Sequence, residues 1–208
     1  MIFKNRKDAG EWLAEVLRGY CGADAVIFAI PRGGVLIGAE VARILKLPLS
    51  FVIAKKIGHP GGAEYAIAAV SEGGAVVSND LEVAEVDSIW LRREIESKQR
   101  DAEERSNRYR ENRKPADLKG KIAIIIDDGI ATGFTMRAAI KEIAARKPAK
   151  IIVGIPVAPK EAANEIAPLA DEIAVVCTTA SYFGAVGLYY ETFPEVSDKE
   201  VIDILKRA

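Results

Sequence analysis

Short apolar runs alternate with amphipathic stretches along this chain. Five of the runs are rich in β-branched residues and short enough for strands buried on both faces of a sheet. They cover residues 25–30, 50–54, 121–127, 150–156 and 172–177. Between them, the spacing of apolar residues predicts helices at residues 34–45, 134–146 and 159–167. This alternation is typical of βαβ units, so we predict an α/β fold with a central, mostly parallel sheet flanked by helices.

One segment departs from this alternation in the way that a hairpin would. Residues 71–78 have the pattern of a hairpin tip and its return strand, because Gly73 and Gly74 can supply the positive φ values that such turns need. No linker divides the chain, so we expect one domain that covers residues 1–208.

A second departure is a long, highly charged helix predicted over residues 88–113. Its thin apolar seam consists of Ile95, Ala102 and Tyr109, which lie one heptad apart. Such a helix can rest on the domain with its charged face in water, act as a moving lid or contribute to a dimer. The pattern leaves these roles open.

Composition and charge narrow the function classes. Half of the 208 residues are hydrophobic and 28% are charged, which is typical of a globular protein. Lys plus Arg (29) nearly balance Asp plus Glu (30), so no global basic field favours nucleic acid or an anionic membrane. Cys21 and Cys177 are too few for a disulfide scaffold and lack the spacing of a zinc site. We therefore expect a cytoplasmic protein that contacts neither membrane nor nucleic acid.

A glycine-punctuated turn follows the predicted strand at residues 121–127 and leads into a helix. Gly129 and Gly133 allow backbone N–H groups and the helix N-terminus to converge on one phosphate, and Thr132 and Thr135 can add hydroxyl donors. The turn lacks the lysine with which a Walker A loop reaches the β- and γ-phosphates. It therefore suits a monophosphate better than a nucleoside triphosphate.

Two adjacent acids, Asp127 and Asp128, precede this turn. Carboxylates repel a phosphate, but they accept hydrogen bonds from two hydroxyl groups of a sugar on the same ligand. Ligands of parallel α/β sheets bind at this carboxyl edge. A phosphatase or receiver-domain site and a purely structural acid pair are the alternatives.

The stretch Ile126-Asp127-Asp128-Gly129-Ile130-Ala131-Thr132-Gly133-Phe134-Thr135 resembles the diagnostic loop of type I phosphoribosyltransferases. The resemblance implies binding of 5-phosphoribosyl 1-diphosphate, here called the donor, together with Mg²⁺ and a small-molecule acceptor. It assigns the ribose and 5-phosphate of the donor to Asp127, Asp128, Gly129, Ile130, Ala131, Thr132, Gly133, Phe134 and Thr135. Mg²⁺ would be held through the diphosphate, and by Asp127 through water. The most similar group consists of predicted phosphoribosyltransferases whose acceptor is not established.

A second glycine turn follows the first predicted strand and matches the family's diphosphate loop. The resemblance assigns the diphosphate to Pro31, Arg32, Gly33, Gly34, Lys55, Lys56 and His59. That loop commonly contains a cis bond that does not precede proline, and we expect it at Arg32–Gly33. Ordinary strand-to-helix geometry and a polar strand end are the alternatives for this turn and the two lysines.

Residues 58–66 are rich in glycine, and we interpret them as a long flexible loop rather than a tight turn. Their position matches the family's mobile loop, which covers about residues 55–75 here and would exclude water from the ribosyl cation. Glu64 is the candidate general acid or base by a loose resemblance to the adenine enzymes, with Glu191 as a reserve. His59 is either a diphosphate contact or an incidental polar residue.

Aromatic residues gather near the C-terminal end, where the resemblance implies a small hood at about residues 178–196. The acceptor would contact Tyr182, Phe183, Tyr189 and Glu191. Stacking on a planar heterocycle and packing of the hood onto the domain are both open for these rings. Ala131 occupies the position where 6-oxopurine enzymes have an aspartate, which disfavours hypoxanthine and guanine as acceptors.

We therefore predict a phosphoribosyltransferase that acts on a nucleobase-like nitrogenous heterocycle, as a homodimer. The alternative is a non-catalytic regulator that senses the donor and controls nucleic acid or a partner protein. Both acids, a diphosphate loop and a plausible lid favour the enzyme.

Overall fold

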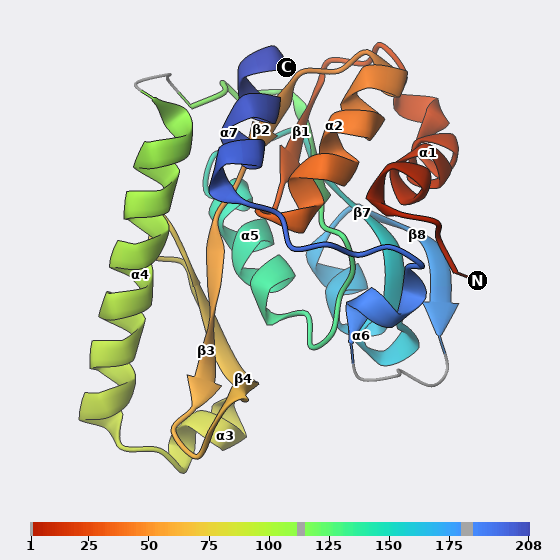
Figure 1. Cartoon of the computed structure of the whole chain (residues 1–208). Helices are drawn as coiled ribbons and strands as arrows, with labels where there is room; N and C mark the ends of the chain where they lie inside the picture. Colours follow the sequence, from red (N-terminus) through yellow and green to blue (C-terminus); the bar gives the residue numbers. More distant parts are fainter. Residues whose placement is uncertain (1, 112–114, 180–184) are drawn as a thin grey trace.

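In the computed structural model, which describes residues 2–111, 115–179 and 185–208, the centre of the molecule is a parallel sheet of five strands (Figure 1). The strand order is β2-β1-β6-β7-β8. The strands are β1 (Ala25–Ala29), β2 (Leu49–Phe51), β6 (Ile122–Ile126), β7 (Lys150–Pro159) and β8 (Glu172–Thr179). The predicted α/β fold and parallel sheet are confirmed.

Helices cover both faces of this sheet. The side chains of each strand alternate between the two faces, and in β1 and β6 apolar side chains on both faces are buried. Ile27 and Ile124 pack in one buried cluster with residues of α1 (Arg6–Val16) and α2 (Gly33–Leu45). On the other face, the buried cluster contains residues of α5 (Phe134–Ala144) and α6 (Lys160–Ile166). The three predicted helices are confirmed as α2, α5 and α6.

Two helices near the ends of the chain were not predicted. They are α1 and α7 (Asp198–Arg207), which begins with a capping box formed by Ser197 and Glu200. The remaining short elements are the 3₁₀ turns η1 (Arg18–Tyr20), η2 (Ala167–Leu169) and η3 (Val186–Tyr189) and the helix α3 (Asp80–Ala84). Among the described residues, no helix combines the length and the apolar character needed to cross a membrane.

A second, antiparallel sheet consists of β3 (Ala54–His59), β4 (Gly62–Ser71) and β5 (Val76–Ser78). The predicted hairpin at residues 71–78 is confirmed, and Gly74 has the positive φ of 85° that its turn needs.

The prediction of a long loop at residues 58–66 is wrong, because a short turn joins β3 directly to β4. Residues 66–70 are buried apolar residues, and their burial stabilises β4 as a strand. Gly58 is required at a bulge, since a Cβ atom there would lie 2.2 Å from the carbonyl oxygen of Ala63.

The long charged helix is present as α4 (Ser88–Arg110) and rests along the second sheet (Figure 1). Ala102 and Tyr109 of its predicted seam are buried, and Ile95 packs against Ile57 and its neighbours in this sheet. The seam is thus a packing face, as expected for a helix that rests on the domain.

A buried charge network ties this second sheet to the rest of the molecule. The Glu72 carboxylate lies 2.7 Å from Nη2 of Arg110 and 3.3 Å from Nη2 of Arg146, and its side chain is 8% exposed. Next to it, the hydroxyl group of Ser71 donates a hydrogen bond to the Glu142 carboxylate (2.7 Å). The network therefore connects the β4–β5 turn with α4 and with the end of α5.

Replacing Glu72 with Gln should destabilise the fold strongly. The neutral amide removes the carboxylate charge that faces both Arg110 and Arg146, and breaking a buried ion pair costs about 3 kcal/mol, although Arg146 keeps its contact with Glu142 at 3.7 Å. The matched control is Glu15→Gln, since the Glu15–Arg18 pair is exposed and such pairs contribute about 0–1 kcal/mol. Urea unfolding measures both variants, and equal losses would show that the buried network adds no stability.

Candidate functional site

The two acids predicted from the sequence lie where β6 leaves the parallel sheet. Strand register places the ends of β1 and β6 side by side, and Ile30 N–H donates to the Ile126 carbonyl oxygen (2.8 Å). A Cβ atom on Gly33 would lie 1.7 Å from Oδ2 of Asp128. The structure thus brings the predicted diphosphate loop directly against the acid pair.

Burial gives the two carboxyl groups unequal properties. It raises the pKa of Asp127 well above its usual range, and the negative charge of Asp128 adds to this shift. Burial also raises the pKa of Asp128, but the positive charge of Arg6 opposes the shift. Because Arg6 Nε donates to Asp128 Oδ2 at 2.9 Å, Asp128 is the acid better able to hold a negative charge.

Two residues that hold this pair were not predicted from the sequence. Arg6, at the start of α1, is 7% exposed and also donates from Nη1 to the Pro194 carbonyl oxygen (2.8 Å). The hydroxyl group of Tyr190 donates to the backbone oxygen of Asp128 (2.6 Å). Tyr190 belongs to an aromatic cluster visible in the sequence, whereas no local signal distinguishes Arg6 from other helix-start arginines.

The predicted phosphate loop encloses a small cavity of about 180 Å³ that Asp127, Thr132 and Thr135 line. The side chains of Ile130 and Phe134 are buried in the core, so they anchor the loop. The backbone and the threonine hydroxyl groups remain available at the cavity. Gly129, Ala131 and Gly133 also line the cavity, and Gly133 has a φ of 78° at the start of α5.

In the predicted diphosphate loop, the cis bond that does not precede proline lies at Pro31–Arg32. The expectation of a cis bond at Arg32–Gly33 is wrong. Gly33 is the first residue of α2, so the peptide bond between Arg32 and Gly33 has the trans geometry of a helix. Gly34 approaches the strand end so closely that a Cβ atom would lie 2.9 Å from the Ile126 carbonyl oxygen.

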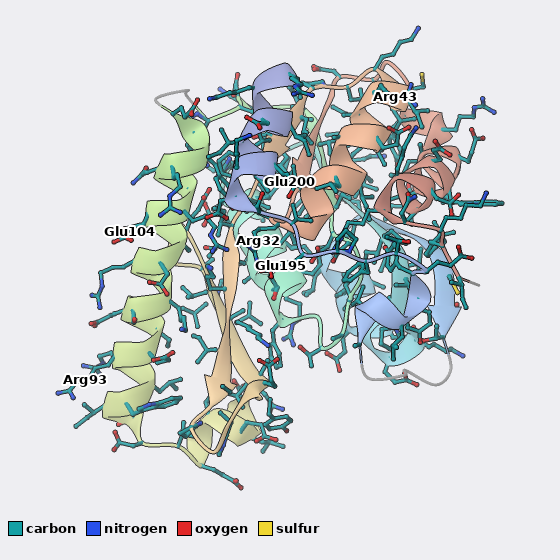
Figure 2. All side chains as sticks on the ribbon, in the orientation of Figure 1. Arg32, Arg43, Arg93, Glu104, Glu195 and Glu200 are labelled. Atoms are coloured by element: carbon teal, nitrogen blue, oxygen red, sulfur yellow. The ribbon has the colours of Figure 1, made fainter. Side chains whose placement is uncertain are left out.

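Arg32 points toward the segment before α7 (Figure 2). Its Nη2 atom donates to Oε1 of Glu195 at 2.5 Å. Together with Arg6, Gly33 and Phe193, these two residues line a further cavity of about 390 Å³.

Comparison with known proteins identifies the family. Residues 1–191 match the phosphoribosyl transferase domain. The chain belongs to this family. It is 37% identical, over its whole length, to a protein from Mycobacterium tuberculosis strain H37Rv named "Putative phosphoribosyl transferase", of which it covers 47%. The chain thus spans about half the length of the curated relatives it matches.

Solved structures share the fold of this chain. The crystal structure of TT1426 from Thermus thermophilus superposes with a TM-score of 0.82 and is 38% identical, over 100% of this chain and 99% of that one. A purine phosphoribosyltransferase from Pyrococcus horikoshii shares the fold, with a TM-score of 0.51 and 19% identity over 92% and 89% of the two chains.

The two lysines predicted for the diphosphate of this phosphoribosyl transferase domain lie in different surroundings. Adjacent residues of a strand point to opposite faces. Lys56 lines the cavity at the phosphate loop, and its Nζ atom lies 2.6 Å from Oε2 of Glu64. Lys55 is half-buried on the α4 side, where burial lowers its pKa and the nearby Arg105 charge adds to the shift. The structure therefore brings Lys56, and not Lys55, to the cavity beside the acid pair.

The remaining loop candidates lie on the β3–β4 hairpin. The ring of His59 accepts a hydrogen bond from the Gly61 N–H group at Nδ1 (3.0 Å), which closes the turn. Glu64 has a side chain that is 95% exposed, and the hydrogen bond from Lys56 lowers its pKa. Neither His59 nor Glu64 lines the cavity at the phosphate loop.

The hood candidates divide into buried, exposed and undescribed residues. Tyr189 is 4% exposed and packs in the core cluster of the α1 face, so its ring holds the hood onto the domain. Glu191 is exposed, and its N–H group donates to the Phe3 carbonyl oxygen (2.8 Å). Tyr182 and Phe183 lie outside the described residues.

Replacing Gly33 with Ala should disturb the acid pair. The added Cβ atom would occupy the position of the Asp128 carboxylate, and overpacking of this kind costs about 1–3 kcal/mol. Gly19→Ala is the matched control, because no atom lies within 4 Å of a Cβ atom there. Thermal unfolding should show a clear loss for Gly33→Ala alone; an unchanged midpoint would contradict the close approach of the two loops.

Proposed function

We propose that this domain transfers the phosphoribosyl group of the donor, 5-phosphoribosyl 1-diphosphate, to a nitrogenous acceptor. The observation that carries the proposal is the partly buried acid pair, which lies between the cavity of the phosphate loop and the glycine turn at Gly33. The donor has three parts in the matching order: a monophosphate, a ribose with two free hydroxyl groups, and a diphosphate.

Each part of the site has a role in binding the donor. The backbone of residues 129–135 and the threonine hydroxyl groups bind the 5-phosphate at the start of α5. Asp127 and Asp128 accept hydrogen bonds from the two ribose hydroxyl groups. Arg32 and the amide groups at the start of α2 bind the diphosphate. Lys56, predicted for the diphosphate, lines the cavity of the phosphate loop and adds positive charge beside the acid pair.

The reaction is a displacement at C1 of the ribose. The bond between C1 and the diphosphate oxygen breaks and leaves its electron pair on the diphosphate, while a nitrogen lone pair of the acceptor forms the new bond to C1. The acceptor nitrogen then loses its proton. Positive charge develops on the ribose ring, and the carboxylate charge beside the ring stabilises it.

Mg²⁺ fits this site as a partner of the donor. It prefers oxygen ligands and usually combines one or two carboxylates with substrate phosphates. Within the described ranges, no cluster of three or more His, Cys, Asp or Glu side chains could hold a metal ion. The diphosphate would therefore supply most of the ligands, with Asp127 contributing through water. When bound, Mg²⁺ neutralises the leaving group.

The acceptor is proposed to be a nucleobase-like heterocycle other than a 6-oxopurine. Ala131 lines the phosphate cavity with a methyl group, which cannot accept the proton of a purine ring nitrogen. Glu64 stays the candidate for proton transfer and Glu191 the reserve. The hydrogen bond from Lys56 lowers the pKa of Glu64, so its carboxylate is ionised at neutral pH and cannot act as the acid, and it is a weaker base while this bond persists. The homodimer and the cytoplasmic location also stay predictions.

Donor binding should depend on both acids. Asp127→Asn together with Asp128→Asn weakens two charge-assisted hydrogen bonds, each worth about 1.5–3 kcal/mol, so the donor Kd should rise by roughly a hundredfold or more. Calorimetry at fixed Mg²⁺ measures this rise, with Asp24→Asn at the opposite end of the sheet as the control. Unchanged donor affinity in a folded double variant would overturn the proposed site.

The acceptor preference can be measured as diphosphate release with Mg²⁺, the donor and hypoxanthine, guanine, adenine, uracil or orotate. We expect turnover with a base outside the 6-oxopurines, and a lower rate after Glu64→Gln. Efficient turnover of hypoxanthine or guanine, undiminished by Glu64→Gln, would show that Ala131 and Glu64 are misassigned. Donor binding without turnover of any acceptor in a wider pool would favour a donor-sensing regulator.

A further inference from the structure

Arg6 joins three segments of the site that are far apart in the sequence. Its Nε atom contacts Asp128, 122 positions away, and its Nη1 atom contacts Pro194 in the C-terminal segment. The guanidinium carbon lies 3.6 Å from the centroid of the Phe193 ring. On the other side, a Cβ atom on Gly33 would lie 2.8 Å from Nε of Arg6. The side chain is thus fixed by the acid pair, the hood and the diphosphate loop together.

The contact with Asp128 leaves room for a ligand. Nε donates to a single carboxylate oxygen, Oδ2, whereas an ionised carboxylate offers acceptor positions on both oxygens. Asp128 can therefore keep its ion pair and accept a hydrogen bond from a ribose hydroxyl group. The Arg6 side chain does not line the cavity of the phosphate loop, although it lines the cavity beside Arg32 and Gly33, so its effect on the ribose hydroxyl groups would pass through Asp128.

The hood side of Arg6 is equally well fixed. The Phe193 ring that stacks on the guanidinium group also packs on Tyr190, with ring centroids 4.7 Å apart. Tyr190 in turn donates to the backbone of Asp128 (2.6 Å). Arg6, Phe193, Tyr190 and Asp128 form a closed ring of contacts, so the carboxylate cannot shift without disturbing the hood.

We propose that Arg6 is a positioning residue that fixes the Asp128 carboxylate for the ribose hydroxyl group of the donor and couples it to the hood through Phe193. This inference rests on the proposed function. It distinguishes ligands by their parts: those with a ribose diol depend on Arg6, and inorganic phosphate bound at the phosphate loop, whose cavity Arg6 does not line, does not. A residue that only supports the fold would affect both kinds of ligand alike.

The test is calorimetry at fixed Mg²⁺ with three ligands, namely the donor, ribose 5-phosphate and inorganic phosphate. For Arg6→Met we expect the Kd of both ribose ligands to rise by about tenfold or more, as for loss of a charged hydrogen bond, with the inorganic phosphate Kd unchanged. Arg6→Lys keeps the charge but lacks the planar fork, so it should restore part of the ribose-ligand affinity. Arg18→Met, on an exposed pair near the end of α1, is the control and should match the wild type.

The outcomes separate the two proposals. If the wild-type protein does not bind the donor, the proposed function fails. If it binds the donor and Arg6→Met binds all three ligands as the wild type does, or loses all three equally, the role of Arg6 is refuted. Should Arg6→Met not fold, Arg6→Lys decides by the same comparison, because selective loss of the ribose ligands supports positioning and uniform behaviour overturns it.

Discussion

Two adjacent carboxyl groups are partly buried at the end of β6, and much of the site is arranged to compensate for their loss of contact with water. A buried charge is costly unless it is paired and hydrogen-bonded. The Arg6 guanidinium group pairs with Asp128, and the Asp128 N–H group donates to Asp127 Oδ1 at 2.8 Å. These partners come from the first helix and from the loop itself. The acid pair thereby fixes how the N-terminal helix and the hood sit on the sheet.

The same constraint explains the two glycine turns. The register of β1 and β6 brings the turn at Gly33 and Gly34 against the acids, where any side chain would collide with a carboxylate or the strand backbone. On the other side of the acids, Gly133 allows the backbone to enter α5 with a positive φ of 78°. Close backbone approach on both sides brings backbone amide groups near the acids, beside the side chains of Lys56, Thr132 and Thr135 that line the cavity. Amide groups held in this way suit the phosphate groups at the two ends of the proposed donor.

The sequence predicted the parts of the fold and site that depend on local pattern. Apolar β-branched runs indicated the five parallel strands, and the glycine spacing after Asp127 and Asp128 indicated the phosphate loop, because both signals lie within a few residues. The β3–β4 hairpin was missed since its glycine-rich turn hid the small apolar run of β4. Arg6 was missed because its partner is 122 positions away. A contact of this kind follows from how the elements pack, which a single sequence does not specify.

The site therefore has two sides that differ in how firmly they are held. The phosphate loop is anchored by Ile130 and Phe134 in buried clusters, so displacing it would open the core. The end of the β3–β4 hairpin is held by polar contacts, such as the exposed pair of Lys56 and Glu64, which water can replace at little cost. An enzyme that forms a ribosyl cation needs a rigid frame for the ribose and a cover that can open for the ligands. In the proposed function, the partly buried acids would supply the first, and the exposed end of the β3–β4 hairpin would supply the second.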